Sequence, residues 1–365
     1  MSRLLLLSAS AFLLAVVAHA QSPSLPRYKV LFLDTVTRES LARVASQGYR
    51  IAERGGRVAA SFMVFERSAG AYEYSVSLLE DLGKVPPGYR VLPHTVVPGP
   101  RASCAAILER APGDRVPRDY RIEREGFRRI WGTLSVPRSL IKGIAKAATD
   151  GYRIIAAGGN CAVLERPRDA TREAAGTPPR YQLIAPRSTK ALEREMALAV
   201  ARGYRLHWVF YHEHLVFVME RQDNAPALDH LVVAAEWPPN QSWVPRLEPK
   251  LNEAALRGYH LIEVSIATLG NEVVAVMEKR EAPLVEYRVL ETFTERGYAP
   301  SSWRPLEQEF LAASEQGWEY VALGPVPSTS WSTTGTSPGF FDYEYGPPFP
   351  PTVRAIVLQR PAGRR

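Results

Sequence analysis

The sequence Gly48-Tyr49-Arg50-Ile51 returns in varied form five more times along a chain of 365 residues. The other copies are Gly88-Tyr89-Arg90-Val91, Gly151-Tyr152-Arg153-Ile154, Gly203-Tyr204-Arg205-Leu206, Gly258-Tyr259-His260-Leu261 and Gly317-Trp318-Glu319-Tyr320. Each copy is followed by an apolar run that ends in a polar or charged pair, such as Glu66-Arg67. A signature that recurs in this way indicates an internal repeat, which must be recognised before any single element is assigned.

One unit reads as strand, helix, strand, strand. Tyr28 to Leu33 is rich in β-branched and apolar residues, which favours a strand. Leu41, Val44 and Ala45 then fall on one face at helical spacing, and Gly48 can end a helix in the left-handed conformation at little cost. Two more strands follow. The predicted units cover residues 28–67, 72–110, 120–167, 181–221, 228–280 and 287–361.

This pattern predicts the arrangement inside each unit. The first strand and the Gly-Tyr strand are joined through a helix, so we expect them to run parallel by a right-handed crossover. The third strand follows by a hairpin and is expected between the other two. A lone three-stranded sheet buries little, so the units should pair or stack. The predicted fold is α+β: six tandem strand-helix-strand-strand repeats, side by side or in pseudo-twofold pairs, with small mostly antiparallel sheets and helices packed on one face.

The second and sixth units depart from the pattern. Leu78 to Gly83 leaves room for barely a turn of helix before Pro86-Pro87. The sixth unit carries a long insertion, residues 325–351, ahead of its last strand. We therefore expect a degenerate helix in the second unit and a large loop in the sixth.

The sixth unit also carries a resemblance to a known family. Tyr287-Arg288-Val289, a helix ending in Glu315-Gln316-Gly317-Trp318-Glu319-Tyr320-Val321 and a closing apolar-Gln-Arg strand resemble a small bacterial domain of unknown function. Members of that family read roughly Tyr-Lys-Val, helix, Gly-Trp-Glu-Leu-Val, and end in a Phe-Lys-Arg strand. The other units look like looser versions, and the resemblance covers most of residues 28–361. It implies the fold of one unit, and the family has no assigned activity or catalytic residues to transfer.

The N-terminus predicts export. Arg3 precedes an apolar run from Leu4 to Val17 and then Ala18-His19-Ala20, which is the pattern of a secretory signal peptide over residues 1–20. The apolar run is too short for a membrane span, which needs about 20 residues. We expect a periplasmic or secreted protein without a membrane span. The net charge of +7 comes from dispersed basic residues, so nucleic-acid binding is not indicated.

Two cysteines, Cys104 and Cys161, stand just ahead of the closing pairs of consecutive units. An exported protein meets an oxidising environment, where a bridge between neighbouring strands can form. Their offsets from the closing pair differ by one residue, which points the side chains to opposite faces of regular strands. The sequence leaves both the bridged and the free forms open.

Four arginines follow the repeated Gly-Tyr: Arg50, Arg90, Arg153 and Arg205. Alternation along a strand places the neighbouring Tyr and Ile inward and these arginines outward. One hypothesis is a ladder that binds an anionic envelope polymer. The alternative, which we favour, is a solvated strand face with weak pairs to the repeated glutamates.

Two further groups raise catalytic hypotheses. His207, His212 and His214 cluster in the fourth unit, and residues 212 and 214 share a face if they lie on one strand, which suits a zinc or copper pair. The region also reads as a polar hairpin turn, which is the favoured interpretation. Gly335-Thr336-Ser337-Pro338-Gly339 matches the nucleophile-elbow string, but its flanks are not the required strand and helix.

The insertion over residues 325–351 is rich in aromatic residues and is the stretch that differs most from the repeated pattern. Loops of this length in compact domains are usually functional or disordered, and aromatic side chains suit a recognition surface. The same side chains could instead cover the open sheet of the sixth unit. The binding candidates are Trp331, Phe340, Phe341, Tyr343 and Tyr345.

The leading hypothesis for function is an exported non-catalytic binding or scaffold protein, with no cofactor and with an unknown protein or anionic envelope polymer as partner. The alternatives are a metal-dependent hydrolase that uses the histidine cluster and an exported inhibitor of a secreted enzyme.

Overall fold

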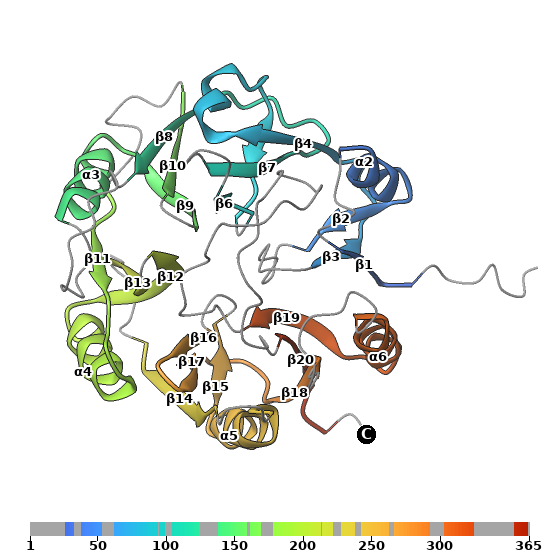
Figure 1. The fold of residues 1–365 in the computed structure, drawn as a ribbon, viewed down its shortest axis with the longest axis vertical. Helices are drawn as coiled ribbons and strands as arrows, with labels where there is room; N and C mark the ends of the chain where they lie inside the picture. Colours follow the sequence, from blue (N-terminus) through green and yellow to red (C-terminus); the bar gives the residue numbers. More distant parts are fainter. Residues whose placement is uncertain are drawn as a thin grey trace, which may run out of the picture.

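A computed structural model of the chain describes residues 26–32, 38–52, 62–93, 95–98, 104–124, 138–158, 161–168, 178–212, 214–221, 228–237, 242–262, 266–292, 303–324 and 354–363. These residues form a ring of small sheets, with the α-helices on its outer rim between successive sheets (Figure 1). The binding candidates of the 325–351 insertion, the Gly335–Gly339 string and the signal peptide lie outside the described residues.

Six groups of elements follow one another around the ring, and we number them units 1 to 6. Unit 1 contains β1 (Tyr28–Phe32), α2 (Arg38–Ser46), β2 (Tyr49–Ile51) and β3 (Phe62–Arg67). Unit 2 contains β4 (Glu73–Leu78), η2 (Leu79–Lys84), β5 (Tyr89–Val91), β6 (Val97–Pro98) and β7 (Cys104–Arg110). Unit 3 contains β8 (Arg118–Arg124), α3 (Arg138–Thr149), β9 (Arg153–Gly158) and β10 (Cys161–Pro167). Unit 4 contains β11 (Tyr181–Ile184), α4 (Thr189–Val200), β12 (Tyr204–His212) and β13 (His214–Arg221). Unit 5 contains β14 (His230–Glu236), α5 (Val244–Leu256), β15 (Tyr259–Leu261), β16 (Ala267–Leu269) and β17 (Glu272–Lys279). Unit 6 contains β18 (Val285–Thr292), α6 (Trp303–Glu315), β19 (Glu319–Gly324) and β20 (Arg354–Pro361).

Every sheet has the strand order predicted from the sequence. The last strand of each unit lies in the middle and pairs antiparallel with both neighbours, as in β1-β3-β2 and β18-β20-β19. The first and second strands therefore run parallel. Small antiparallel sheets together with helices confirm the α+β class.

The repeated glycine has one local role. In all six copies its φ lies between 81° and 90°. This left-handed conformation strains residues with a Cβ atom, and it turns the chain from the helix, or from the Pro86-Pro87 turn of unit 2, into the second strand. In unit 1, the Gly48 N–H donates to Ala45 O over 2.9 Å as the helix ends.

The apolar helix faces predicted from the sequence are also confirmed. Buried in the core are Leu41, Val44 and Ala45 of α2, Leu140, Ile144 and Ala147 of α3, Leu192, Met196 and Ala199 of α4, Leu247, Leu251, Ala254 and Ala255 of α5, and Leu306, Phe310 and Ala313 of α6. In unit 2 the helix is reduced to the 3₁₀ turn η2, in which Leu79 and Leu82 are buried.

Each core cluster joins two successive units. Leu247 and Leu251 of α5, for example, pack in one cluster with Tyr287 and Val289 of β18 in unit 6. Leu306 and Phe310 of α6 pack in the same way with residues of unit 1 such as Tyr28, which closes the ring. A sheet too small to bury its own surface is thus covered by a helix of the preceding unit. The units lie side by side around a ring (Figure 1).

The outer edge of one sheet is covered by side chains of a helix. Asn252 of α5 donates to Tyr287 O over 2.9 Å and accepts from Tyr287 N over 2.7 Å. Glu248, one turn earlier, accepts from Val289 N over 2.7 Å. These bonds satisfy backbone groups of β18 that an edge strand would otherwise leave open.

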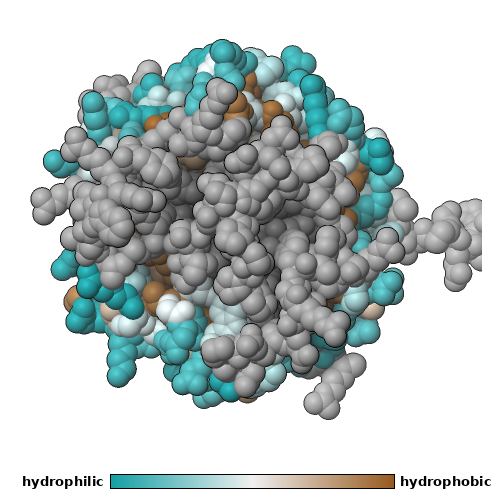
Figure 2. Space-filling model, in the orientation of Figure 1, coloured by the Kyte–Doolittle hydropathy of each residue, from teal (hydrophilic) through white to brown (hydrophobic). Residues whose placement is uncertain are grey.

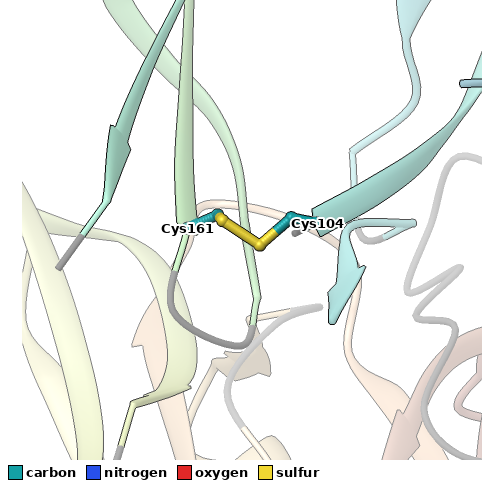
Figure 3. Close-up of a disulfide and its surroundings, with 2 residues drawn as sticks. All are labelled: Cys104 and Cys161. Atoms are coloured by element: carbon teal, nitrogen blue, oxygen red, sulfur yellow. A yellow bond between two sulfur atoms is a disulfide. The ribbon is translucent and has the colours of Figure 1, made fainter. Parts of the chain in front are cut away.

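Cys104 and Cys161 form a disulfide between β7 of unit 2 and β10 of unit 3, with their Cα atoms 6.5 Å apart (Figure 3). Both side chains are buried in the cluster that unit 2 shares with unit 3. A bridge between two sheets that pack face to face needs cysteines that project from opposite faces of their own sheets. The one-residue difference in offset from the closing pairs places Cys104 and Cys161 in this way.

The outer rim is mostly hydrophilic, with small hydrophobic patches between charged residues (Figure 2). Among the described helices, none is both long and apolar enough to cross a membrane.

Candidate functional site

The repeated signatures meet in one row of three side chains in every sheet. In unit 2, Tyr74 of the first strand pairs in register with Glu109 of the middle strand, which pairs with Arg90 of the second strand. The other rows are Tyr28–Glu66–Arg50, Tyr120–Glu165–Arg153, Tyr181–Glu220–Arg205, His230–Glu278–His260 and Tyr287–Gln359–Glu319. Directly opposed residues project from the same face, so each row forms a polar strip on its sheet.

In the five rows that contain a tyrosine, this residue contacts the preceding unit. Tyr74 Oη accepts a hydrogen bond of 2.9 Å from the N–H of Ile51, on the edge strand of unit 1. The same bond recurs from Ile154 N to Tyr181, from Leu261 N to Tyr287 and from Tyr320 N to Tyr28, at 3.0, 2.7 and 3.3 Å. Tyr120 also contacts the preceding unit, because its hydroxyl donates to Tyr89 O over 3.2 Å.

The glutamates Glu109 and Glu278 of two rows each accept hydrogen bonds from arginines of their own unit and of the preceding unit. Glu109 is fully buried and accepts from Arg50 of unit 1, with Nη2–Oε1 at 3.0 Å and Nε–Oε2 at 3.1 Å. Arg90 of its own unit binds the same carboxylate at 3.0 Å, and Tyr74 donates to it over 3.0 Å. One carboxylate therefore binds two guanidinium groups between units 1 and 2.

The junction between units 4 and 5 repeats this arrangement. Arg205 binds both oxygens of the buried Glu278, and Arg280 donates to Glu278 over 2.9 Å. Burial alone would raise the pKa of Glu278, but the hydrogen bonds from Arg205 and Arg280 outweigh it and hold that pKa below its usual value. Glu278 is therefore charged at neutral pH.

The junction between units 2 and 3 carries a weaker version. Glu165 lies 3.4 Å from the Arg118 guanidinium. Burial raises the pKa of the Glu165 carboxyl above its usual value, although Tyr120 and Arg118 both favour the charged form.

The expectation that the four arginines line a solvated strand face needs correction. Arg50 is largely buried and Arg205 is about one third exposed, and both pair with a glutamate of the next unit, whereas Arg153 is mostly exposed, 3.8 Å from Glu220. Alternation along a lone strand takes no account of the neighbouring unit. That unit covers the edge of the sheet and supplies the carboxylate.

The second residue of three closing pairs lies over an aromatic ring of the repeated signature. Arg110, Arg166 and Arg360 lie over the rings of Tyr89, Tyr152 and Trp318, with 5.2, 4.5 and 4.4 Å to the ring centroids. In these three units a cation–π contact at the end of the sheet joins the repeated aromatic residue to the repeated basic residue.

The three histidines of the fourth unit do not converge. His207 binds Ile154 O of unit 3 through Nε2 at 2.9 Å, and its Nδ1 lies 3.4 Å from Glu220. His212 and His214 pair in register at the far end of the same two strands. Five residues of strand separate His207 from His212, about 16 Å. Among the described residues, no group of three or more His, Cys, Asp or Glu could hold a metal ion.

The contact between units 6 and 1, which closes the ring, has the opposite arrangement of acidic and basic residues. Unit 6 has Glu319 where units 1 to 4 have Arg, and its carboxylate lies 3.1 Å from Arg27, which precedes Tyr28 of unit 1. The first and last units thus meet through an ion pair of their own. The sheets of units 1 and 6 share a core there as well.

Sequence reasoning missed the first-strand tyrosines and the unusual histidines of unit 5. The signal was present: Tyr28, Tyr74, Tyr120, Tyr181 and Tyr287 each open a unit, and His230 takes that place in unit 5. Their role depends on the register that pairs them with the glutamates, which is a property of the folded sheet.

The junction contacts give a direct prediction. Replacing Tyr287 by phenylalanine removes the acceptor of the Leu261 N–H inside a buried contact, so we expect a loss of about 1–2 kcal/mol in the free energy of unfolding. Urea denaturation checks this value. As a control, Tyr152→Phe retains the ring that lies under Arg166 and should cost less than about 0.5 kcal/mol. Equal losses in the two variants would contradict the assigned role of the Tyr287 hydroxyl.

Comparisons with protein-family models, with curated proteins and with solved structures returned no match.

Proposed function

We propose that this chain is an exported, non-catalytic binding or scaffold protein whose ring holds recognition loops at fixed positions. The observation that carries the proposal is the recurrence of the same junction contacts around a closed ring. The buried ionisable side chains Glu109 and Glu278 are engaged in holding units together. Such a frame suits the display of loops, because the last strand of each unit, at which such a loop ends, is paired on both sides within its sheet.

The insertion of unit 6 is the proposed recognition element. It leaves β19 at Gly324 and returns at β20, where Gly324 pairs with Ala355. The β19 end of unit 6 lies on the inner side of the ring, as do β6, β9, β12 and β16 of other units (Figure 1). The insertion is therefore anchored on a paired strand end beside the corresponding parts of the other units. Its aromatic side chains supply large contact area at low entropic cost.

A protein partner is favoured over an anionic polymer. The arginine ladder would have to give up its pairs with Glu109 and Glu278 before it could bind a polymer. Breaking a buried ion pair costs about 3–5 kcal/mol, which opposes such an exchange. Aromatic residues among Ser, Gly and Pro are instead the composition of protein-recognition loops.

Two further parts of the proposal concern origin and location. We infer that the six units are degenerate tandem copies of one strand-helix-strand-strand module with its helix packed on one face, related to the small bacterial domain that unit 6 resembles. We also infer export through residues 1–20 to the periplasm or the medium. The buried Cys104–Cys161 disulfide supports export, since such bonds persist in oxidising compartments.

The test is a capture experiment with envelope extract. The immobilised mature protein is compared with a variant that carries Ser at the five aromatic positions Trp331, Phe340, Phe341, Tyr343 and Tyr345. We expect a specific protein that binds the first and is lost by the second, with at least a tenfold weaker Kd on remeasurement with the purified partner. Circular dichroism verifies that the variant is folded.

A second loop provides the matched control. Replacing residues 53–60, which connect β2 and β3 in unit 1, by a Gly-Ser linker of equal length should leave capture unchanged. A partner kept by the aromatic variant and lost by this control would overturn the assignment of the insertion. A captured hydrolase whose activity falls on binding would identify the protein as an inhibitor.

A further inference from the structure

Unit 5 is the one described unit with histidine at two positions of its polar row. His230 stands where the other units have Tyr, and His260 stands where four of them have Arg. Both pair in register with Glu278, so the row reads His230–Glu278–His260 across three strands. One histidine lies at the junction with unit 4, and the other at the junction with unit 6.

His230 occupies a buried site that is built for a neutral ring. Its Nδ1 lies 2.7 Å from Leu228 O, so Nδ1 carries the proton and Nε2 is the position that can take up a second one. Nε2 is buried and has no hydrogen-bond partner among the described residues. It lies 3.7 Å from Glu278 Oε1, beyond hydrogen-bond distance.

The acidic groups around His230 do not balance a second positive charge on its ring. Glu278 of β17 is already bound by Arg205 from unit 4 and by Arg280, and the other acid that acts on His230 is Asp229, which directly precedes it. Burial lowers the pKa of His230, with a further lowering from Arg205, against weaker support from the Leu228 carbonyl, Glu278 and Asp229.

His260 has the same character on the other side of the unit. It is buried, and its Nε2 has no hydrogen-bond partner among the described residues. The adjacent Leu261 N–H donates to Tyr287 of unit 6, so His260 lies at that junction. Its register partner Glu278 is bound by Arg205 and Arg280. Burial lowers the pKa of His260, and Arg280 lowers it further.

The two row positions of unit 6 nearest this junction, Tyr287 and Gln359, carry no carboxylate, and Glu319 at the far end of the row pairs with Arg27. Tyr287, whose pKa is raised to about 12 by burial, is neutral, and Gln359 replaces the glutamate of the other units. Between units 1 and 2, Arg50 pairs with Glu109. At the corresponding place between units 5 and 6, a protonated His260 has no carboxylate of unit 6 as its partner among the described residues.

We propose that unit 5 is a pH-responsive segment of the ring, whose junctions with units 4 and 6 loosen together when His230 and His260 take up protons. The unfolded or opened segment binds these protons at the ordinary histidine pKa of about 6.5, whereas the closed ring binds them only at lower pH. Closure is therefore strongest above about pH 6.5 and weakens as the pH falls below it. Each histidine contributes at most a tenfold change in the opening equilibrium for each pH unit. Glu278 stays charged across this range because its pKa is lowered.

Hydrogen exchange of the full-length mature protein tests the proposal. Exchange rates at pH 7 and pH 5, corrected for the intrinsic rate of each amide, are compared for peptides that cover β14, β15 and β17 and for peptides that cover β4 and β7 of unit 2. We expect the opening equilibrium of the unit 5 peptides to rise at least tenfold at pH 5, with a change below threefold in unit 2. Equal changes in the two units, or none, would overturn the proposal.

A variant that restores the row of the other units provides the second arm. His230→Tyr supplies the missing hydroxyl, and His260→Arg together with Gln359→Glu rebuilds the ion pair that joins units 1 and 2. This triple variant should exchange at least as slowly as the natural protein at pH 7 and lose the difference between pH 7 and pH 5. The control variant His207→Gln, at the junction of units 3 and 4, should keep the unit 5 response. A pH response that remains in the triple variant would show that other groups cause it, and this would contradict the proposal. Should the triple variant fail to fold, His230→Tyr alone is measured and must abolish the response of β14 peptides.

Discussion

Replacing Glu109 by alanine is expected to lower the free energy of unfolding by about 3–5 kcal/mol, because it leaves two guanidinium groups at a buried junction without their carboxylate. Arg50 and Arg90 both bind Glu109, and Tyr74 loses its acceptor as well. Urea denaturation followed by circular dichroism measures the loss.

A second glutamate of the same unit is the matched control for Glu109. Glu73 also pairs with an arginine, Arg110, but both side chains are well exposed. Exposed pairs are worth up to about 1 kcal/mol, so Glu73→Ala should change stability by no more than that. Similar losses in the two variants would show that the row glutamate is not a junction element.

Removing the disulfide is expected to cost up to about 4 kcal/mol, since the bridge closes a loop across 57 residues of the unfolded chain. The double variant Cys104→Ala/Cys161→Ala tests this in urea. The effect should be large for this protein because the bridge joins unit 2, whose helix is reduced to a single 3₁₀ turn, to unit 3.

Reduction of the natural protein supplies the comparison for the double variant. Both cysteines are buried, so reductant acts after opening, and unfolding in the presence of reductant should give the same midpoint as the double variant. A variant as stable as the oxidised natural protein would mean that units 2 and 3 are held together by their apolar contacts alone.

The interior of each unit follows from its local sequence. Glycine at the helix end, apolar residues at helical spacing and the short hairpin connection together determine the strand order, and all of these are signals within one unit. The buried faces of α4 and α5 were predicted for this reason. The degenerate helix of unit 2 was predicted from Pro86-Pro87 and the short run before them.

The junctions could not be predicted in the same way, because they depend on residues far apart in the chain. Arg50 contacts a carboxylate that belongs to the next unit, 59 positions further on. Reading β2 as a lone strand placed Arg50 toward solvent, although a neighbouring unit covers it. The sequence alone leaves the disulfide open for a related reason. A one-residue offset separates bonded from free cysteines only when it is known which faces of the two sheets pack together.

Ring closure is the central claim, and cross-linking of Arg27→Cys with Glu319→Cys tests it most directly. The two natural side chains lie 3.1 Å apart although 292 positions separate them in the chain, and both are exposed enough to react. A short bifunctional maleimide applied to dilute oxidised protein should join them within one chain, which mass spectrometry of the linked peptides identifies. The pair Arg27→Cys with Glu193→Cys on α4 is the control and should not link within the chain. Failure of the first pair, or links only between chains, would contradict a closed ring.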